Sequence, residues 1–181
     1  MSILVGIDPG SGKSSNTAIA CFNSSSKEIY FCVEIEPTVD PKKDPFHFLL
    51  NDLAAQLAVH MGNIKKLAPN KNSEVHVYIE NFVMRGKGGQ VLNQAVGALL
   101  SRIPMTFSCT TVMNTSVKAL VAGNGKADKV EVASGVVRYF KANGHPESAD
   151  FVQDLLDLGY YDRTDAFAIA IAGHARRMTK T

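Results

Sequence analysis

The sequence has no tryptophan, only three cysteines and no long apolar run. Cys21, Cys32 and Cys109 lack the paired spacing of a metal site, so free thiols in a reducing compartment are the simpler interpretation. The apolar stretch 166–173 is too short to span a bilayer, and the first residues lack the pattern of a secretory signal. We therefore expect a soluble, cytoplasmic protein without a membrane-bound part.

A strong excess of charge of either sign is also missing. The formal net charge is +2 over 181 residues, which permits binding to nucleic acid but does not demand it. Any basic surface must therefore be local. The length and a hydrophobic content of 45% are typical of one globular domain, and we expect a single domain over residues 1–181.

The glycine that a phosphate-binding loop requires is absent too. Gly12, Lys13 and Ser14 resemble the end of such a loop, but the glycine five positions earlier is replaced by Ile7. A branched residue cannot adopt the open backbone conformation that glycine supplies there. We therefore reject a phosphate-binding loop and expect a β-turn at residues 12–14.

The pattern of apolar residues predicts an α/β fold. Branched and aromatic runs predict five strands, and apolar residues at helical spacing predict four helices. The strands are expected at 3–8, 17–22, 28–35, 75–80 and 105–112, and the helices at 46–64, 91–99, 126–140 and 162–178. Three meandering strands followed by strands that alternate with helices predict a mixed five-stranded sheet with helices on both faces.

Two of these strands end in an acid, Asp8 after "ILVGI" and Glu80 after "VHVYI". The carboxyl ends of parallel strands meet at one edge of a sheet, so we expect these two carboxylates to lie close together. Asp162 and Asp165 are three residues apart and would share one face of the last helix. Four acids at one edge would repel one another unless a cation joined them. Oxygen ligands favour Mg²⁺ or Mn²⁺, and two such ions about 4 Å apart support hydrolysis of a phosphodiester.

Each acid also has a simpler interpretation. Asp162 could be the N-cap of the last helix with Asp165 in its first turn, and Asp8 could be a turn residue before Pro9. Glu80 is harder to explain in this way, because a glutamate at the end of an apolar strand needs a partner.

Four segments together resemble the RuvC family of Holliday junction resolvases, which have a ribonuclease H-like fold. They are "GIDPGS", "VYIENF", "SVKALVAGNGKADKVEV" and "DRTDAFAIAIA", and they occur in the family's order over nearly the whole chain. The resemblance implies a homodimeric endonuclease that uses two Mg²⁺ ions per site, which Mn²⁺ could replace. Its substrates would be four-way junctions and other branched DNA in a bacterial or phage-infected cell. It also implies that Asp8, Glu80, Asp162 and Asp165 hold the metal.

The resemblance and the composition of one loop suggest a DNA-binding surface. The loop after Glu80 contains Phe82, Arg85 and Lys87, which suit unstacking of bases and contacts with phosphates. The family places its wedge aromatic where Val83 stands here, which leaves open whether Phe82 or Val83 acts as the wedge. An ordinary flexible loop with Phe82 in the core is the alternative.

Two lysines match the family as well. Lys118 and Lys129 are implied to contact DNA and support catalysis, although isolated lysines are usually surface charges. The segment 147–161 is longer than in the relatives and suggests an extra helical turn or two.

Three functions therefore remain open. The first is a junction-resolving endonuclease, the second an RNA-processing nuclease of the same superfamily, and the third a DNA-binding module without activity. In a homodimer, we expect the interface between the two chains to form on the apolar face of the helix at 91–99. This face consists of Val91, Ala95, Ala98 and Leu99. That face could equally pack on its own sheet.

Overall fold

The computed structural model describes residues 2–10, 16–40, 42–68, 73–81 and 87–179. Its centre is a five-stranded sheet in the order β3-β2-β1-β4-β5. The strands are β1 (Ser2–Asp8), β2 (Thr17–Asn23), β3 (Ile29–Ile35), β4 (Glu74–Asn81) and β5 (Ser108–Met113). β1, β2 and β3 pair antiparallel, whereas β4 is parallel to both β1 and β5. The predicted mixed sheet, including the hairpin of its second and third strands, is confirmed.

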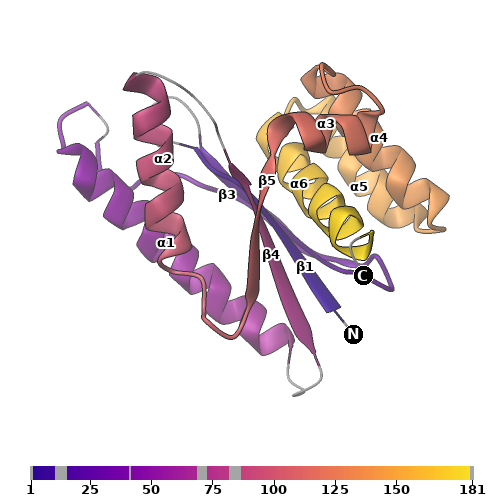
Figure 1. Ribbon diagram of the computed structural model, residues 1–181, viewed down its shortest axis with the longest axis horizontal. Coiled ribbons are helices and arrows are strands. Elements are labelled where there is room, and N and C mark those ends of the chain that lie inside the picture. The colour runs from indigo at the N-terminus through magenta and orange to yellow at the C-terminus, as the bar shows by residue number, and fades with distance from the viewer. Residues whose placement is uncertain (1, 11–15, 41, 69–72, 82–86, 180–181) are drawn as a thin grey trace.

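Helices cover both faces of the sheet, as Figure 1 shows. One face carries α1 (Phe46–Leu67) and α2 (Lys87–Leu100). The other carries α3 (Asn114–Ala122), α4 (Lys129–Ala142), α5 (Pro146–Asp157) and α6 (Tyr161–Met178). No helix among the described residues has the length and apolar character that crossing a membrane would require.

Two helices were missed by the sequence prediction. α3 begins directly after β5, and nine residues with one fully apolar turn give too weak a periodic signal. α5 occupies most of the segment 147–161, where only an extra helical turn or two was expected. The fifth strand was also placed too early, because Met105 is fully exposed and the strand begins at Ser108.

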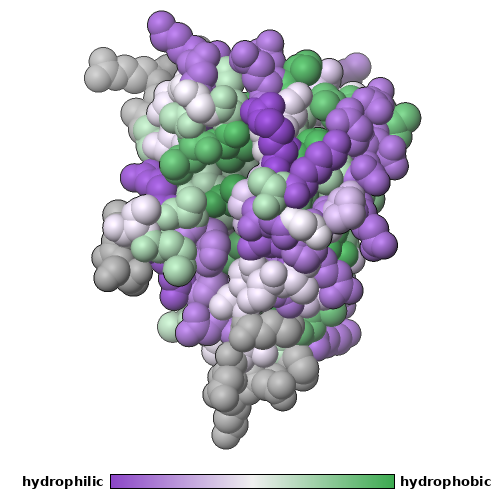
Figure 2. All heavy atoms as spheres, turned by 90° about the vertical axis from the view of Figure 1, so that its right-hand side faces the viewer, coloured by the Kyte–Doolittle hydropathy of each residue, from purple (hydrophilic) through white to green (hydrophobic). Residues whose placement is uncertain are grey.

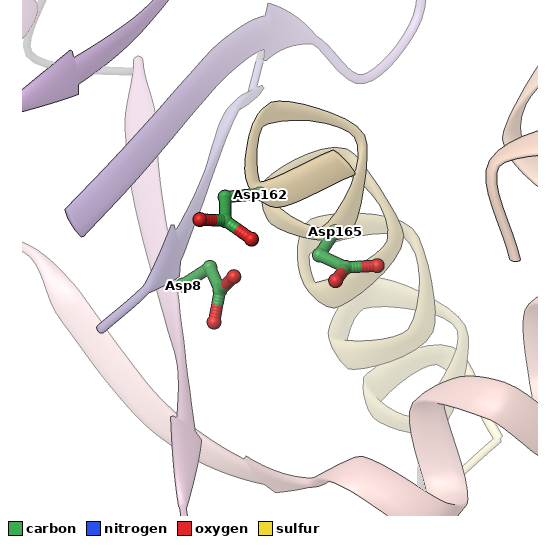
Figure 3. A group of neighbouring side chains, drawn as sticks. All are labelled: Asp8, Asp162 and Asp165. Atoms are coloured by element: carbon green, nitrogen blue, oxygen red, sulfur yellow. The ribbon is translucent and has the colours of Figure 1, made fainter. Parts of the chain in front are cut away.

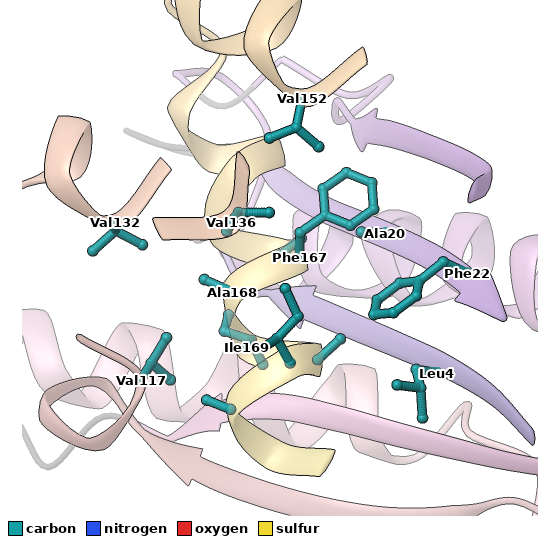
Figure 4. Packing of buried hydrophobic residues seen from close by; sticks show 14 of the residues in the cluster. Leu4, Ala20, Phe22, Val117, Val132, Val136, Val152, Phe167, Ala168 and Ile169 are labelled. Carbon is teal, nitrogen blue, oxygen red and sulfur yellow. The ribbon is translucent and has the colours of Figure 1, made fainter. Parts of the chain in front are cut away.

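A separate hydrophobic core lies on each face of the sheet. On the side of α6, the ring of Phe22 from β2 contacts that of Phe167, with centroids 5.9 Å apart (Figure 4). It also contacts the ring of Phe140, at a centroid distance of 5.5 Å. Burial of each such ring contributes about 2–3 kcal/mol.

On the side of the molecule shown in Figure 2, hydrophilic and hydrophobic residues are interspersed. Val130 on α4 and Phe151 on α5 are both exposed. Val130 is exposed although it continues the helical spacing of the buried Ala133, Val137 and Phe140.

The apolar face of α2 is mainly used within the chain. Ala95 and Leu99 are each 1% exposed, and Leu99 belongs to the core on the α1 side of the sheet. Val91 and Ala98 are only partly exposed. The prediction that these four residues form a seam between two chains is therefore wrong for Ala95 and Leu99, which the chain's own packing already covers.

Candidate metal centre

The register of the sheet brings Asp8 and Glu80 to the same edge. β1 and β4 are parallel with Ile7 opposite Ile79, so the next residue of each strand is one of the two acids. Asp8 is the last residue of β1 and is partly buried, and the side chain of Glu80 is buried. The acids that end these two strands are therefore neighbours, as the sequence predicts.

Two glycine contacts hold α6 close to this sheet. A β-carbon at Gly6 would lie 1.8 Å from the carbonyl oxygen of Ala166, so only glycine lets β1 and α6 approach so closely. Farther along α6, a β-carbon at Gly173 would lie 2.1 Å from the Tyr78 ring on β4. The first contact sits two residues before Asp8 and one residue after Asp165, and therefore brings the acids of the strand and the helix together.

The result is a compact group of three carboxylates, shown in Figure 3. Asp8, Asp162 and Asp165 each offer an oxygen, and these oxygens all lie within 4.8 Å of one another. Asp162 is not the N-cap of α6: the N-cap is Tyr160, and no side chain caps the helix. Arg163, between the two aspartates, pairs with Glu34 on β3 at 3.1 Å, which anchors the start of the helix to the sheet.

Glu80 adjoins this group without belonging to it. It lines a small cavity of about 90 Å³ together with Asn114, Lys118, Lys129 and Asp165. Its Oε1 is buried and has no hydrogen-bond partner. A buried carboxylate oxygen without a donor requires either a proton or a cation.

The pKa values of the acids reflect their crowding. Burial, and then the charges of Asp165, Glu80 and Asp162, raise the pKa of Asp8 well above its usual value. Burial raises the pKa of Glu80 to about 7, although a hydrogen bond with Asn114 and the charge of Lys118 oppose the shift. Burial likewise raises the pKa of Asp165 to about 6, against the charges of Lys129 and Lys118. Without a cation, the site favours protonated carboxyl groups.

Lys129 brings a positive charge into direct contact with the aspartates. Its Nζ lies 2.8 Å from Asp162 and 3.9 Å from Asp165. Burial disfavours its charge, but the hydrogen bond and charge of Asp162, followed by Asp165 and Asp8, hold its pKa above the usual value. Lys129 is the first residue of α4, whose start is fixed by a capping box between Asp128 and Glu131. The fold therefore aims this ammonium group at the acids.

Lys118, also expected to contact DNA, lies in α3 and lines the cavity beside Glu80. Lys118 and Lys129 are therefore both located at the acidic centre. Phe82 and Arg85, and with them Val83 and the expected turn at residues 12–14, lie outside the described residues. Lys87 is the first residue of α2.

Asn114 and Gly6 are site residues that the sequence prediction missed. Asn114 directly follows β5, so the rule that ligands gather at the carboxyl ends of parallel strands could have found it. The close approach at Gly6 needed the packing of α6 and carries no local sequence signal.

The donor set suits a hard divalent cation. Asp8, Asp162 and Asp165 could hold such an ion, because they offer only oxygen atoms, and the unpartnered Oε1 of Glu80 could join them. The raised pKa values point the same way, since a bound cation would remove the repulsion that favours protonation.

Solved structures with a similar fold exist. The structure of Thermus thermophilus RuvC matches with a TM-score of 0.59 and 18% sequence identity, over 98% of this chain and 96% of that chain. T. thermophilus RuvC in complex with a Holliday junction substrate matches with a TM-score of 0.58 and the same identity and coverage. No family model matches this sequence, and no curated protein matches it either. The likeness establishes the fold, which is ribonuclease H-like and similar to that of RuvC.

Proposed function

We propose that this chain is a metal-dependent endonuclease that cleaves branched DNA, with four-way junctions as its preferred substrate. The observation that carries the proposal is the acidic centre: three aspartate oxygens within 4.8 Å of one another, beside a buried Glu80 with an unpartnered oxygen. This centre lies in a fold similar to that of a RuvC structure solved with a Holliday junction substrate. We take the whole chain to be one nuclease domain.

Asp8, Glu80, Asp162 and Asp165 would hold Mg²⁺, or Mn²⁺ in its place, as two ions per site. Such ions, when bound, activate water and stabilise charge on the phosphate during hydrolysis of a phosphodiester. Asp8 and Glu80 fix the site from rigid strands, and the contact at Gly6 fixes α6 against them. Rigid support of this kind keeps the reacting groups oriented.

Lys129 and Lys118 would serve the same site. The ammonium group of Lys129 already contacts Asp162, so it is placed to orient that carboxylate and to meet a negatively charged phosphate. Lys118 lies at the adjoining cavity and adds a second positive charge. Phe82, Arg85 and Lys87 remain proposed contacts to the DNA near the branch.

The working unit would be a homodimer. A four-way junction has two equivalent scissile phosphates, and each chain supplies one acidic centre, so two-fold symmetry matches enzyme to substrate. Since Ala95 and Leu99 are buried within the chain, the dimer interface would have to be formed by other residues.

Cleavage of a substrate panel tests the proposal. A four-way junction, a linear duplex of the same sequence and a structured RNA are incubated with the protein and Mg²⁺. We expect cleavage of the junction above that of the duplex and RNA, and loss of cleavage with EDTA. Preferred cleavage of the RNA would instead assign the chain to RNA processing, and absence of any nicking would leave a DNA-binding role.

A further inference from the structure

A second cavity, of about 310 Å³, lies between β5 and the C-terminal part of α6. Its lining includes Thr110 and Thr111 from the strand and the guanidinium-bearing Arg176 and Arg177 from the helix. Of the two threonines, Thr110 lies opposite Tyr78 and so presents its hydroxyl on the α6 side of the sheet. β5 is an edge strand, so in the described sheet no further strand covers its outer side. The cavity therefore combines positive charge, a threonine hydroxyl and a free strand edge.

This cavity and the cavity beside Glu80 lie along the same helix, α6. Along α6, Asp165 and Ile169 line the cavity beside Glu80, and Gly173 and Arg177 line the second one. Successive members of this series are four residues apart and so share one helix face. The twelve helical steps from Asp165 to Arg177 span about 18 Å, or roughly five base-pair steps of duplex DNA.

Tyr78 connects the two cavities on the strand side. It lines the second cavity and lies two residues before Glu80 on β4, so both side chains face α6. The hydroxyl of Tyr78 is buried without a hydrogen-bond partner of normal geometry. Burial raises the pKa of Tyr78, while the nearby Arg177 opposes the shift.

A network of polar side chains fixes Arg177 at the rim. Its Nη1 contacts Nδ1 of the buried His76 and donates to Ser108 Oγ at 3.3 Å. His76 Nε2 lies 3.0 Å from Glu74, which also lies 3.6 Å from Arg177 Nη2. Burial and then the charge of Arg177 lower the pKa of His76, which favours the neutral imidazole.

Arg176 is the neighbouring residue on α6 and is also exposed. Its Nη1 donates to Ser116 Oγ on α3 at 3.4 Å, a long hydrogen bond that leaves most of its donors for a ligand. With one carboxylate, Glu74, against two guanidinium groups, the local formal charge is +1.

We propose that this cavity is a second phosphate-binding site, which takes a phosphodiester of the DNA backbone away from the cleaved bond. The inference rests on the proposed function, because the same DNA would contact both cavities along α6. Arginine forks and threonine hydroxyls are typical phosphate donors. The volume exceeds that of a phosphate group, so an attached deoxyribose would also fit. A mononucleotide offers the same chemistry, and the test must separate the two sources.

The test uses the salt dependence of binding to plain duplex DNA, without metal, which requires neither cleavage nor preference for junctions. Each neutralised phosphate contributes about 0.9 to the slope of log K against log salt concentration. We expect Arg176→Ala to lower this slope by about one, and the double variant Arg176→Ala/Thr110→Val to weaken binding further, because Thr110 shares the α6 side of the sheet with Tyr78. Arg138→Ala, which removes an exposed arginine from α4, is the matched control and should leave the slope unchanged.

A single neutral methylphosphonate, moved stepwise along one strand, locates the contact. We expect one position away from the scissile phosphate to weaken binding by the wild type but not by Arg176→Ala. An equal slope for Arg176→Ala and the wild type would overturn the proposal. Competition by deoxyadenosine monophosphate that is lost in Arg176→Ala, with an unchanged DNA slope, would assign the cavity to free nucleotides and equally overturn it. If junction selectivity fails while the slope still falls, only the proposed function is wrong.

Discussion

Gly6 and Ala166 touch backbone to backbone: a β-carbon at Gly6 would lie 1.8 Å from the carbonyl oxygen of Ala166. This contact joins β1 to α6 next to Asp8 and Asp165, so the geometry of the acidic centre depends on a residue without a side chain.

Gly6→Ala should therefore destabilise the fold by at least about 3 kcal/mol, because neither backbone can yield without moving its whole element. Gly62→Ala is the matched control, since a β-carbon at this exposed position in α1 meets no atom within 4 Å. The control should be stabilised by about 0.5–1 kcal/mol, because alanine favours a helix more than glycine does. Urea unfolding of the three proteins measures both values. Equal stability of Gly6→Ala and the wild type would refute the close approach.

Asp8→Asn should abolish nicking and leave DNA binding intact or tighter. The substitution removes a carboxylate oxygen from the group of three, whereas the cationic contacts to phosphate remain. Cleavage and gel-shift assays on one junction separate the two effects. Asp150→Asn, which neutralises an exposed acid of α5, should cleave like the wild type. Wild-type cleavage by Asp8→Asn would exclude this residue from the site.

The metal-free protein should lose stability as the pH rises. The pKa of Glu80 is about 7 in the folded chain, against 4.5 ordinarily, because of burial first. A raised pKa means that the folded state binds the proton more tightly than the unfolded state. The associated stability is complete below about pH 4.5 and is lost as the pH rises through about 7, on the order of 1–3 kcal/mol.

Glu80→Gln should flatten this dependence between pH 5 and 8, and Mg²⁺ should restore stability to the wild type at pH 8. Thermal unfolding over that pH range, with and without Mg²⁺, is the measurement. Glu147→Gln, at an exposed glutamate of α5, is the control for loss of one acid. If Glu80→Gln shows the same pH dependence of stability as the wild type, ionisation of Glu80 does not destabilise the folded protein.

Lys129→Gln should bind Mn²⁺ several-fold more tightly than the wild type and yet cleave DNA more slowly. The ammonium group lies 2.8 Å from Asp162 and competes with a cation for that carboxylate, so its removal strengthens the negative field. Calorimetric titration with Mn²⁺ and a cleavage assay report the two effects. Lys141→Gln, at an exposed lysine in the last turn of α4, should change neither. Weaker Mn²⁺ binding by Lys129→Gln would contradict this role.

The sequence predicted the sheet and the proximity of the acids, for physical reasons. Alternating and continuous apolar runs define strands, and the parallel rule then places Asp8 beside Glu80 without knowledge of any contact. The spacing of Asp162 and Asp165 likewise required only helical periodicity. What the pattern could not supply was the distance between α6 and β1, which depends on packing at Gly6.

Tertiary packing also decided the features that were missed. α3 is short and directly follows a strand, so local propensity alone does not separate it from its neighbours. The face of α2 at Ala95 and Leu99 has the composition of an interface, but α1 and the sheet cover it. Whether an apolar stripe meets its own chain or another one is not encoded in its periodicity.

Mapping of the nicks on all four strands of a fixed-sequence four-way junction tests the central claim most directly. In Mg²⁺, the wild type should cut two opposing strands at symmetric positions, and both cuts should appear in the same junction molecule. Mixtures of wild-type and Asp8→Asn chains should give junctions with single nicks, because each mixed dimer holds one complete acidic centre. Cleavage that is equally fast on the linear duplex of the same sequence, or nicks without symmetry on the junction, would contradict the account.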